Sequence, residues 1–229
     1  MKKYTLIGVL SVGILIFGGC SREATKLDCA HLPKEPANLG LLKEEIIKYH
    51  DSGAWDRATA CVVEEAKKTL KKYLPVGKKP LAVVFDIDEA ILTSWELMRT
   101  LDFGYNHDRY KEWELAAKSK PIEPMQDLYA FVKDNGFTTF FITGRRENER
   151  AATERNLQET GFGGWKELFL KPMDYKGTTA SDYKSKAREA IREMGYTIVA
   201  SFGDQASDFS GDPKALHNFK ISNPVYIVP

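Results

Sequence analysis

After residue 80 the chain alternates between two hydrophobic patterns. Continuous apolar runs, which are typical of strands covered on both faces, stand at 81–85, 136–143, 167–171 and 196–204. Between these runs, apolar residues recur at helical spacing over 125–135, 147–160 and 181–194. Gly161 and Gly195 follow the last two segments and are typical of helix ends. This alternation predicts an α/β fold in which right-handed helical crossovers join parallel strands.

Two amphipathic helices are predicted ahead of the first strand, within residues 38–75. An insertion, residues 93–122, follows the first strand and contains an aromatic-rich helix in the segment YNHDRYKEWELAAK. We therefore expect one domain over residues 38–229. It would carry an N-terminal helical segment at 38–75 and a small cap at 93–122.

The N-terminus predicts export. Residues 1–19 combine a short basic start with an apolar run, which is typical of a secretory signal peptide. The segment IFGGC resembles the lipobox of bacterial lipoproteins, which implies cleavage before Cys20 and a diacylglycerol anchor on it. Ser21 after the cysteine goes, in lipoproteins, with export to the outer membrane. Residues 20–37 then read as a tether between a lipid-anchored end and the domain, although an ordinary cleaved signal remains the alternative.

Cysteine use and charge add two expectations. Export would place Cys29 and Cys61 in an oxidising compartment, where a disulfide between them is the first reading. The alternative is two separate thiols, with Cys61 as a small buried apolar residue. The composition is ordinary for a globular protein and the net charge is +1, so bulk charge does not indicate a nucleic-acid polymer as partner. Nothing in the sequence indicates the oligomeric state.

Carboxylates follow the predicted strands where the strands end. Asp86 and Asp88 come directly after the first strand, and Asp204 follows the last, with Asp208 one turn further on. Ligands of open α/β sheets bind at the carboxyl ends of the strands. Carboxylates repel one another and are costly to bury alone, whereas a hard cation such as Mg²⁺ prefers them as ligands. The alternative is a purely structural role, in which the Asp-x-Asp pair forms a turn and Asp204 and Asp208 cap a helix.

Three more residues suit an anion. Thr143 and Gly144 follow the second strand and offer a hydroxyl and an unobstructed backbone N–H. Lys184 stands near the start of the 181–194 helix, where a cation opposes the helix dipole. A phosphate docked at that helix start would satisfy both the dipole and the lysine.

The segments FDIDEAIL, FFITGRRE, SDYKSKAR and FGDQASDF resemble, in order, the four motifs of the haloacid dehalogenase (HAD) superfamily. The segments NLGLLKEEIIKYHDSG and ISNPVYIVP resemble its acid phosphatase branch, the class B and C or subfamily IIIB type. That branch holds bacterial outer-membrane lipoprotein acid phosphatases and plant vegetative storage proteins. The resemblance covers roughly residues 37–229 and implies a HAD Rossmann-like, three-layer fold.

The resemblance also implies roles. Asp86 would be the nucleophile that forms an aspartyl-phosphate, and Asp88 the general acid and then the general base. Mg²⁺ would be held by the side chains of Asp86 and Asp204 and by the backbone carbonyl of Asp88, with Asp208 behind them or bound through water. Thr143, Gly144 and Lys184 would bind the phosphoryl group. The substrates would be small extracytoplasmic phosphomonoesters, with nucleotides among the candidates.

One departure and several alternatives stand beside this reading. Ala90 occupies a position where the family usually has Thr or Val, which predicts an altered rate or specificity. Lys186 competes with Lys184 for the phosphate, but Tyr183 before and Arg188 after favour Lys184 by resemblance. A non-catalytic binding or storage lipoprotein and a phosphotransferase on the same scaffold remain alternatives. Dehalogenase chemistry on carbon is disfavoured, because those enzymes lack an acid two residues after the nucleophile.

Overall fold

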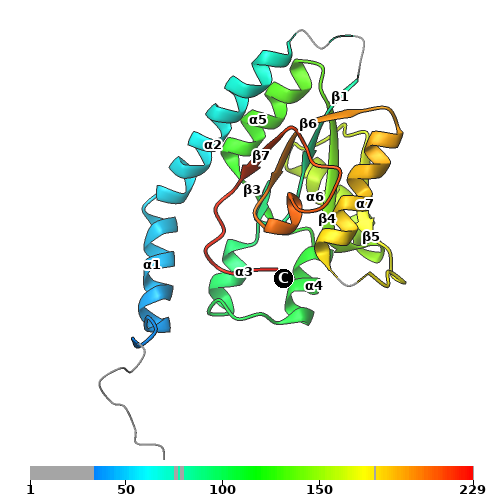
Figure 1. Ribbon diagram of the computed structural model, residues 1–229. Coiled ribbons are helices and arrows are strands. Elements are labelled where there is room, and N and C mark those ends of the chain that lie inside the picture. The colour runs from blue at the N-terminus through cyan, green and yellow to red at the C-terminus, as the bar shows by residue number, and fades with distance from the viewer. Residues whose placement is uncertain (1–33, 75–76, 78–79, 178, 229) are drawn as a thin grey trace, which may run out of the picture. The chain divides into compact units, whose positions relative to one another are not determined.

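The computed structural model describes residues 34–74, 77, 80–177 and 179–228. Its centre is a five-stranded, wholly parallel sheet in the order β5-β4-β1-β6-β7 (Figure 1). The strands are β1 (Leu81–Phe85), β4 (Thr138–Arg146), β5 (Glu167–Lys171), β6 (Thr197–Gly203) and β7 (His217–Lys220). The chain runs outward from β1 through β4 to β5, and then crosses back to β6 and β7 on the other side. The strand order therefore reverses beside β1, which is where ligands of such sheets bind.

Helices cover both faces of the sheet. The helices are α1 (Leu39–Asp51), α2 (Ala54–Leu70), α3 (Trp95–Thr100), α4 (His107–Leu115), α5 (Glu123–Asp134), α6 (Arg150–Glu159) and α7 (Ala180–Glu193). Within the described ranges, short 3₁₀ turns are η2 (Lys71–Tyr73), η3 (Glu147–Glu149) and η4 (Ala206–Asp208). One apolar core joins α2, α5 and α6 to the sheet, and a smaller one joins α7 to the opposite face. This is the predicted three-layer arrangement.

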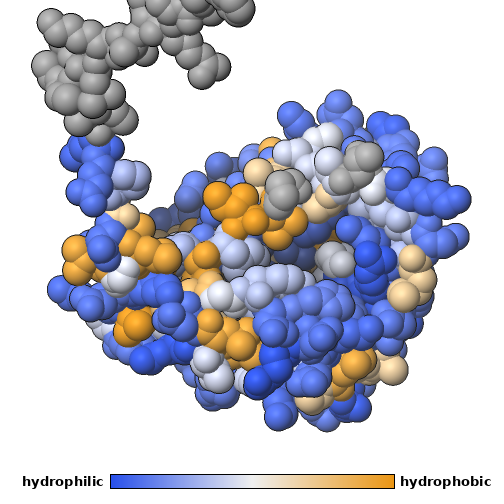
Figure 2. Space-filling model, turned by 90° about the horizontal axis from the view of Figure 1, so that it is seen from below, coloured by the Kyte–Doolittle hydropathy of each residue, from blue (hydrophilic) through white to orange (hydrophobic). Residues whose placement is uncertain are grey.

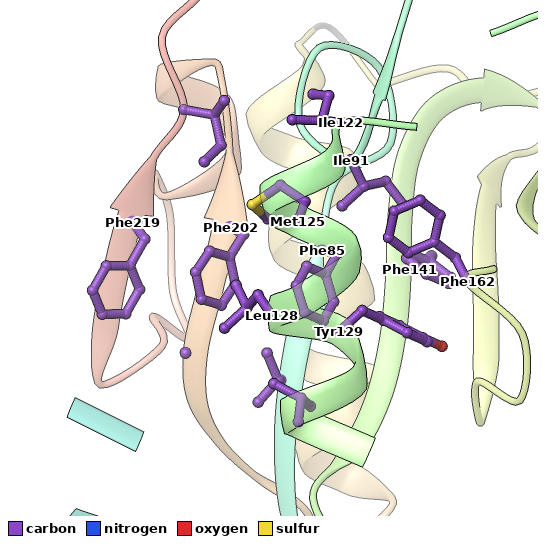
Figure 3. Close-up of a cluster of buried hydrophobic side chains, with 14 of the residues drawn as sticks. Phe85, Ile91, Ile122, Met125, Leu128, Tyr129, Phe141, Phe162, Phe202 and Phe219 are labelled. Carbon is purple, nitrogen blue, oxygen red and sulfur yellow. The ribbon is translucent and has the colours of Figure 1, made fainter. Parts of the chain in front are cut away.

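The larger core is rich in aromatic side chains that lie against α5. Phe85 and Phe202 stack with their ring centroids 5.0 Å apart, and Phe202 stacks in turn on Phe219 (Figure 3). Tyr129 of α5 stacks on Phe141, and its hydroxyl hydrogen-bonds Thr139 at 3.1 Å. Such buried rings contribute both a large apolar area and specific pair geometry. They pack β1, β4 and β6 against α5 in one core.

The insertion after β1 is confirmed. Strands β2 (Leu92–Thr93) and β3 (Lys120–Pro121) pair antiparallel and enclose α3 and α4, which lie beyond the carboxyl ends of the central strands (Figure 1). Ahead of the sheet, the side chain of Asn38 accepts the N–H groups of Gly40 and Leu41 and so begins α1. Gly53, at φ +70°, makes the turn into α2.

Some expectations need correction. The apolar stripe of α2 is centred on Trp55, Val63 and Leu70, and Cys61 is exposed, so the reading of Cys61 as a small buried residue is wrong. Strand β7 was not predicted. Cys20, Cys29, the signal peptide and most of the tether lie outside the described residues. Within the described residues, the structure contains no helix that is both long and apolar enough to span a membrane.

Candidate active site

Three carboxylates meet where the sheet reverses its order. Asp86 follows β1, Asp204 follows the neighbouring strand β6, and Asp208 lies at the end of η4. One carboxylate oxygen from each lies within 4.8 Å of the others, and all three side chains are buried. A short loop makes this approach feasible, because Gly203 has no Cβ and a Cβ there would overlap the carboxylate of Asp208. We call these three residues the acidic cluster.

Lys184 of α7 is the counter-charge of this cluster. Its ammonium group lies 3.0 Å from Asp86 and forms an ion pair with Asp208. Burial raises the pKa of Asp86 well above its ordinary value, and the nearby ammonium opposes that rise only in part. Burial disfavours the charge on Lys184 itself, but Asp86 and Asp208 outweigh that effect and raise its pKa. A single ammonium thus faces three carboxylates, which is the arrangement that favours a bound cation.

The environment of Asp204 fits a metal ion. Its Oδ2 accepts hydrogen bonds from the Gln205 side chain at 2.5 Å and from the Asn223 side chain at 2.6 Å. Its Oδ1 is buried and has no hydrogen-bond partner among the described residues. Burial raises the pKa of Asp204, although the two amide donors lower it. The residues present therefore fit a hard, oxygen-seeking cation such as Mg²⁺, with the free oxygen of Asp204 as a ligand.

Asp88 does not join the acidic cluster. Arg145, near the end of β4, binds the carboxylate of Asp88 by two hydrogen bonds. Nη2 donates to Oδ1 at 2.6 Å and Nε donates to Oδ2 at 3.0 Å. The tight turn after β1 sets Asp88 in this place, because the carbonyl of Ile87 accepts the N–H groups of Ile91 and Leu92 at 3.0 Å each. Sequence reasoning missed Arg145. Its only signal was its place two residues after Thr143.

Glu89 was also missed as part of the site. It stands next to Asp88 with φ +53°, and its carboxylate accepts the backbone N–H of Ser94 at 2.7 Å and the hydroxyl of Thr93 at 2.9 Å. Burial raises its pKa from an ordinary value near 4.5 to about 8. The carboxyl therefore ties the turn after β1 to the beginning of the insertion. Ala90, the departure from the family pattern, is fully buried in the same turn.

The residues predicted to bind phosphate occupy different environments. Thr143 is fully buried and its hydroxyl accepts the backbone N–H of Arg145 at 3.1 Å, whereas Gly144 is exposed. Helix α7 begins at Ala180 and its N-terminus is capped by the Thr179 hydroxyl. Lys184 therefore lies in the second turn of α7, so it opposes the helix dipole less than a cation in the first turn would. Lys184 is part of the site because its ammonium group pairs with Asp86 and Asp208 of the acidic cluster. The phosphate-binding roles of these residues stay predictions.

The insertion brings aromatic and acidic groups to the same end of the sheet. Tyr110 of α4 lies close to Glu89 and Asp88; burial, with those charges, raises its pKa to about 12. Trp95 of α3 stacks on His50, with ring centroids 3.8 Å apart, and both residues line a small pocket. Figure 2 looks at the molecule from below and shows hydrophobic residues in separate patches on a largely hydrophilic surface.

Comparison with known proteins shows the family of this chain. The family model described as HAD superfamily, subfamily IIIB (acid phosphatase) matches residues 23–229. The chain is 34% identical over 148 residues to acid phosphatase 1 of Solanum lycopersicum, which is 63% of this chain and 58% of that protein. It is 31% identical over 202 residues to vegetative storage protein 2 of Arabidopsis thaliana, which is 85% of this chain and 73% of that protein.

A solved structure shares the fold. The class C acid phosphatase of Bacillus anthracis with tungstate bound superposes with a TM-score of 0.67 at 20% identity, over 82% of this chain and 87% of that one. The chain spans 58% to 59% of the length of the first three curated relatives that it matches. The family model covers residues 23–229, which is well over half of the chain. The chain belongs to the HAD superfamily, subfamily IIIB, the acid phosphatase family.

Proposed function

We propose that this protein is a magnesium-dependent phosphomonoesterase that works through an aspartyl-phosphate. The observation that carries the proposal is the acidic cluster itself: Asp86 is buried against Asp204 and Asp208, and one lysine offsets only part of their charge. Family membership supports the reaction class. The substrates we propose are small phosphomonoesters outside the cytoplasm, with nucleotides among them.

In the first step, a carboxylate oxygen of Asp86 attacks the phosphorus atom while the bond from phosphorus to the ester oxygen breaks. Asp88 gives its proton to the departing oxygen, so that an alcohol leaves and Asp88 becomes a carboxylate. In the second step, that carboxylate takes a proton from a water molecule as the water attacks the phosphorus. The acyl phosphate bond then breaks, inorganic phosphate leaves, and Asp86 is restored.

The site residues would support both steps by binding Mg²⁺ and the negatively charged phosphoryl oxygens. Asp86 and Asp204 would hold Mg²⁺ with the Asp88 carbonyl, and Asp208 would keep Lys184 in place. When bound, Mg²⁺ would neutralise the charge of the phosphoryl oxygens. Lys184 would bind one phosphoryl oxygen. Thr143 would order the loop that contacts the other phosphoryl oxygens. In phosphoryl transfer, positioning and charge neutralisation supply most of the rate.

The first test compares the wild type with Asp86→Asn, in the form that lacks residues 1–20. Phosphate release from p-nitrophenyl phosphate and from a nucleotide panel is measured with Mg²⁺ and with EDTA. We expect metal-dependent release that Asp86→Asn abolishes, and a phosphoenzyme that hydroxylamine cleaves. Asp127→Asn, an exposed change on α5, is the matched control and should leave the rate unchanged. No release by folded wild type on any substrate would favour a binding or storage role.

We also propose that the mature protein is anchored in the bacterial cell envelope, at the outer membrane, by a lipid on Cys20. The support is the sequence of the signal peptide and its resemblance to a lipobox. Mass spectrometry of the membrane fraction should find a diacylglyceryl-modified N-terminal cysteine, and Cys20→Ser should release the protein from that fraction. An unmodified mature N-terminus at another residue would contradict the anchor.

A further inference from the structure

We infer that Arg145 is a positioning residue for the reaction: it holds the carboxyl group of Asp88 in the orientation from which Asp88 protonates the leaving oxygen. The inference rests on the function proposed above. It is carried by the two-pronged ion pair between Arg145 and Asp88, a contact between residues 57 positions apart in the chain.

The guanidinium is the fixed member of this pair. The Arg145 side chain is 1% exposed, whereas that of Asp88 is 29% exposed and so faces the opening of the site. Arg145 is anchored twice more, because its Nη1 donates to the hydroxyl of Thr153 at 3.3 Å and its backbone N–H donates to Thr143. A fork of two parallel hydrogen bonds sets both the position and the plane of a carboxylate, which one ammonium group cannot do.

Other carboxylates crowd the same guanidinium. Glu114 of the insertion helix α4 and Glu149 of η3 both lie near enough to act on its charge. Burial, followed by the charge of Asp88, raises the pKa of Glu114 to about 8. Arg145 therefore joins the end of β4 to the turn after β1, with two further carboxyl groups near its charge.

The position of Arg145 predicts which step of the reaction its loss should impair. Arg145 contacts neither Asp86 nor Lys184 through any hydrogen bond in the described part of the chain. Its loss should therefore spare nucleophilic attack and impair proton transfer to the leaving oxygen. Proton transfer matters greatly when an alkoxide leaves and little when p-nitrophenolate leaves, because that anion is already stable. The defect should grow as the leaving group becomes more basic.

The experiment measures kcat/KM for p-nitrophenyl, phenyl and methyl phosphate, since kcat/KM reports formation of the phosphoenzyme and not its hydrolysis. Arg145→Lys keeps the charge but loses the fork. Thr153→Val keeps the shape but loses one anchor of the guanidinium. Asp88→Asn gives the full effect of losing the acid. Arg146→Lys, the same change at the exposed neighbouring arginine, is the control.

We expect Arg145→Lys to lower kcat/KM for methyl phosphate by roughly 10²-fold, within the range of general acid catalysis, and to lower it only a few-fold for p-nitrophenyl phosphate. Thr153→Val should show the same trend at several-fold. Activity on p-nitrophenyl phosphate also reports that each variant is folded. If Arg145→Lys does not fold, the trend in Thr153→Val decides the question.

The outcomes separate this inference from the proposed function. An inactive wild type would overturn the function, and a uniform loss across leaving groups in Asp88→Asn would overturn the role of Asp88. A leaving-group trend in Asp88→Asn, with equal losses for all three substrates in Arg145→Lys or Thr153→Val, would overturn the positioning role of Arg145. An Arg146→Lys variant with the same trend would do so too, because the effect would then not depend on the fork.

Discussion

Replacing Lys184 by methionine should destabilise the protein, and it should do so most when Mg²⁺ is absent. Lys184 is 5% exposed, lies 3.0 Å from Asp86 and pairs with Asp208. Methionine keeps most of the volume and removes the charge. The change leaves Asp86, Asp204 and Asp208 facing one another, and among the described residues no other ion pair is formed with the carboxylate of Asp86 or Asp208. Arg188 donates to Asp208 only at the backbone carbonyl.

The magnitude follows from the burial of these groups. Breaking a buried ion pair on one side costs about 3–5 kcal/mol, because the remaining charge is left without compensation. For a chain of this size, each kcal/mol lowers Tm by about 2–4 °C, so the expected drop is roughly 6–20 °C. Mg²⁺ should return part of this loss, since a cation bound to the folded state alone stabilises it by mass action.

The sign of the pH dependence follows from Asp86. Its pKa in the folded state is already raised above the ordinary value, and loss of the ammonium raises it further. A carboxyl whose folded pKa is raised favours the folded state while it is protonated and loses that advantage as pH rises. The stability difference between Lys184→Met and wild type should therefore shrink on acidification and widen towards neutral pH.

The assay is urea unfolding followed by circular dichroism, in EDTA and in excess Mg²⁺, at several pH values. Lys186→Met is the matched control, because Lys186 lies on the same helix but is exposed, with its ammonium over the ring of Tyr175. That variant should stay within about 0.5 kcal/mol of wild type. Equal stability of Lys184→Met and wild type in EDTA would refute the idea that Lys184 compensates the acidic cluster.

Three further outcomes are expected. Asn223→Ala removes a donor to Asp204 Oδ2, so calorimetric titration should show weaker Mg²⁺ binding, and unchanged affinity would contradict that positioning role. Glu89→Gln should flatten the fall in stability that wild type shows, in EDTA, as pH rises from about 5 to 8, because the pKa of Glu89 is raised to about 8 and its charged form opposes folding. Gly203→Ala should lower both Tm and activity, since its Cβ would overlap the carboxylate of Asp208; a variant with wild-type Tm would show that the loop can yield.

The hydrophobic pattern predicted most of the fold because most strands here are covered on both faces. β1 and β6 lie in the middle of the sheet, and their apolar runs coincide with the observed strands nearly to the residue. β7 escaped prediction because it is an edge strand in which only Phe219 is buried, so HNFK carries no apolar run. β4 continues through Arg146 because its polar end pairs with β5 after a register shift, and a polar strand end looks like a loop.

The candidate site was predictable in its strand-end residues and not in their partners. Asp86 and Asp204 meet because parallel neighbouring strands end at the same edge of the sheet, which sequence order alone indicates. Asp88 is two residues from Asp86 and was expected beside it, yet it turns to Arg145. The hydrogen bond from Asn223 to Asp204 depends on the course of the C-terminal segment, which no periodicity describes.

The two groups of carboxylates at this end of the sheet differ in how their charge is balanced, and the difference indicates their tasks. Around Arg145, a raised pKa allows Glu114 to remain protonated near neutral pH, and the guanidinium holds the carboxyl group of Asp88 by its fork of hydrogen bonds. Around Lys184, Asp86 and Asp204 both have raised pKa values, and Asp204 keeps one buried oxygen without a partner among the described residues. The first group is complete as it stands and is suited to orienting an acid. The second is complete only with an additional cation, which is what a centre for phosphoryl transfer requires.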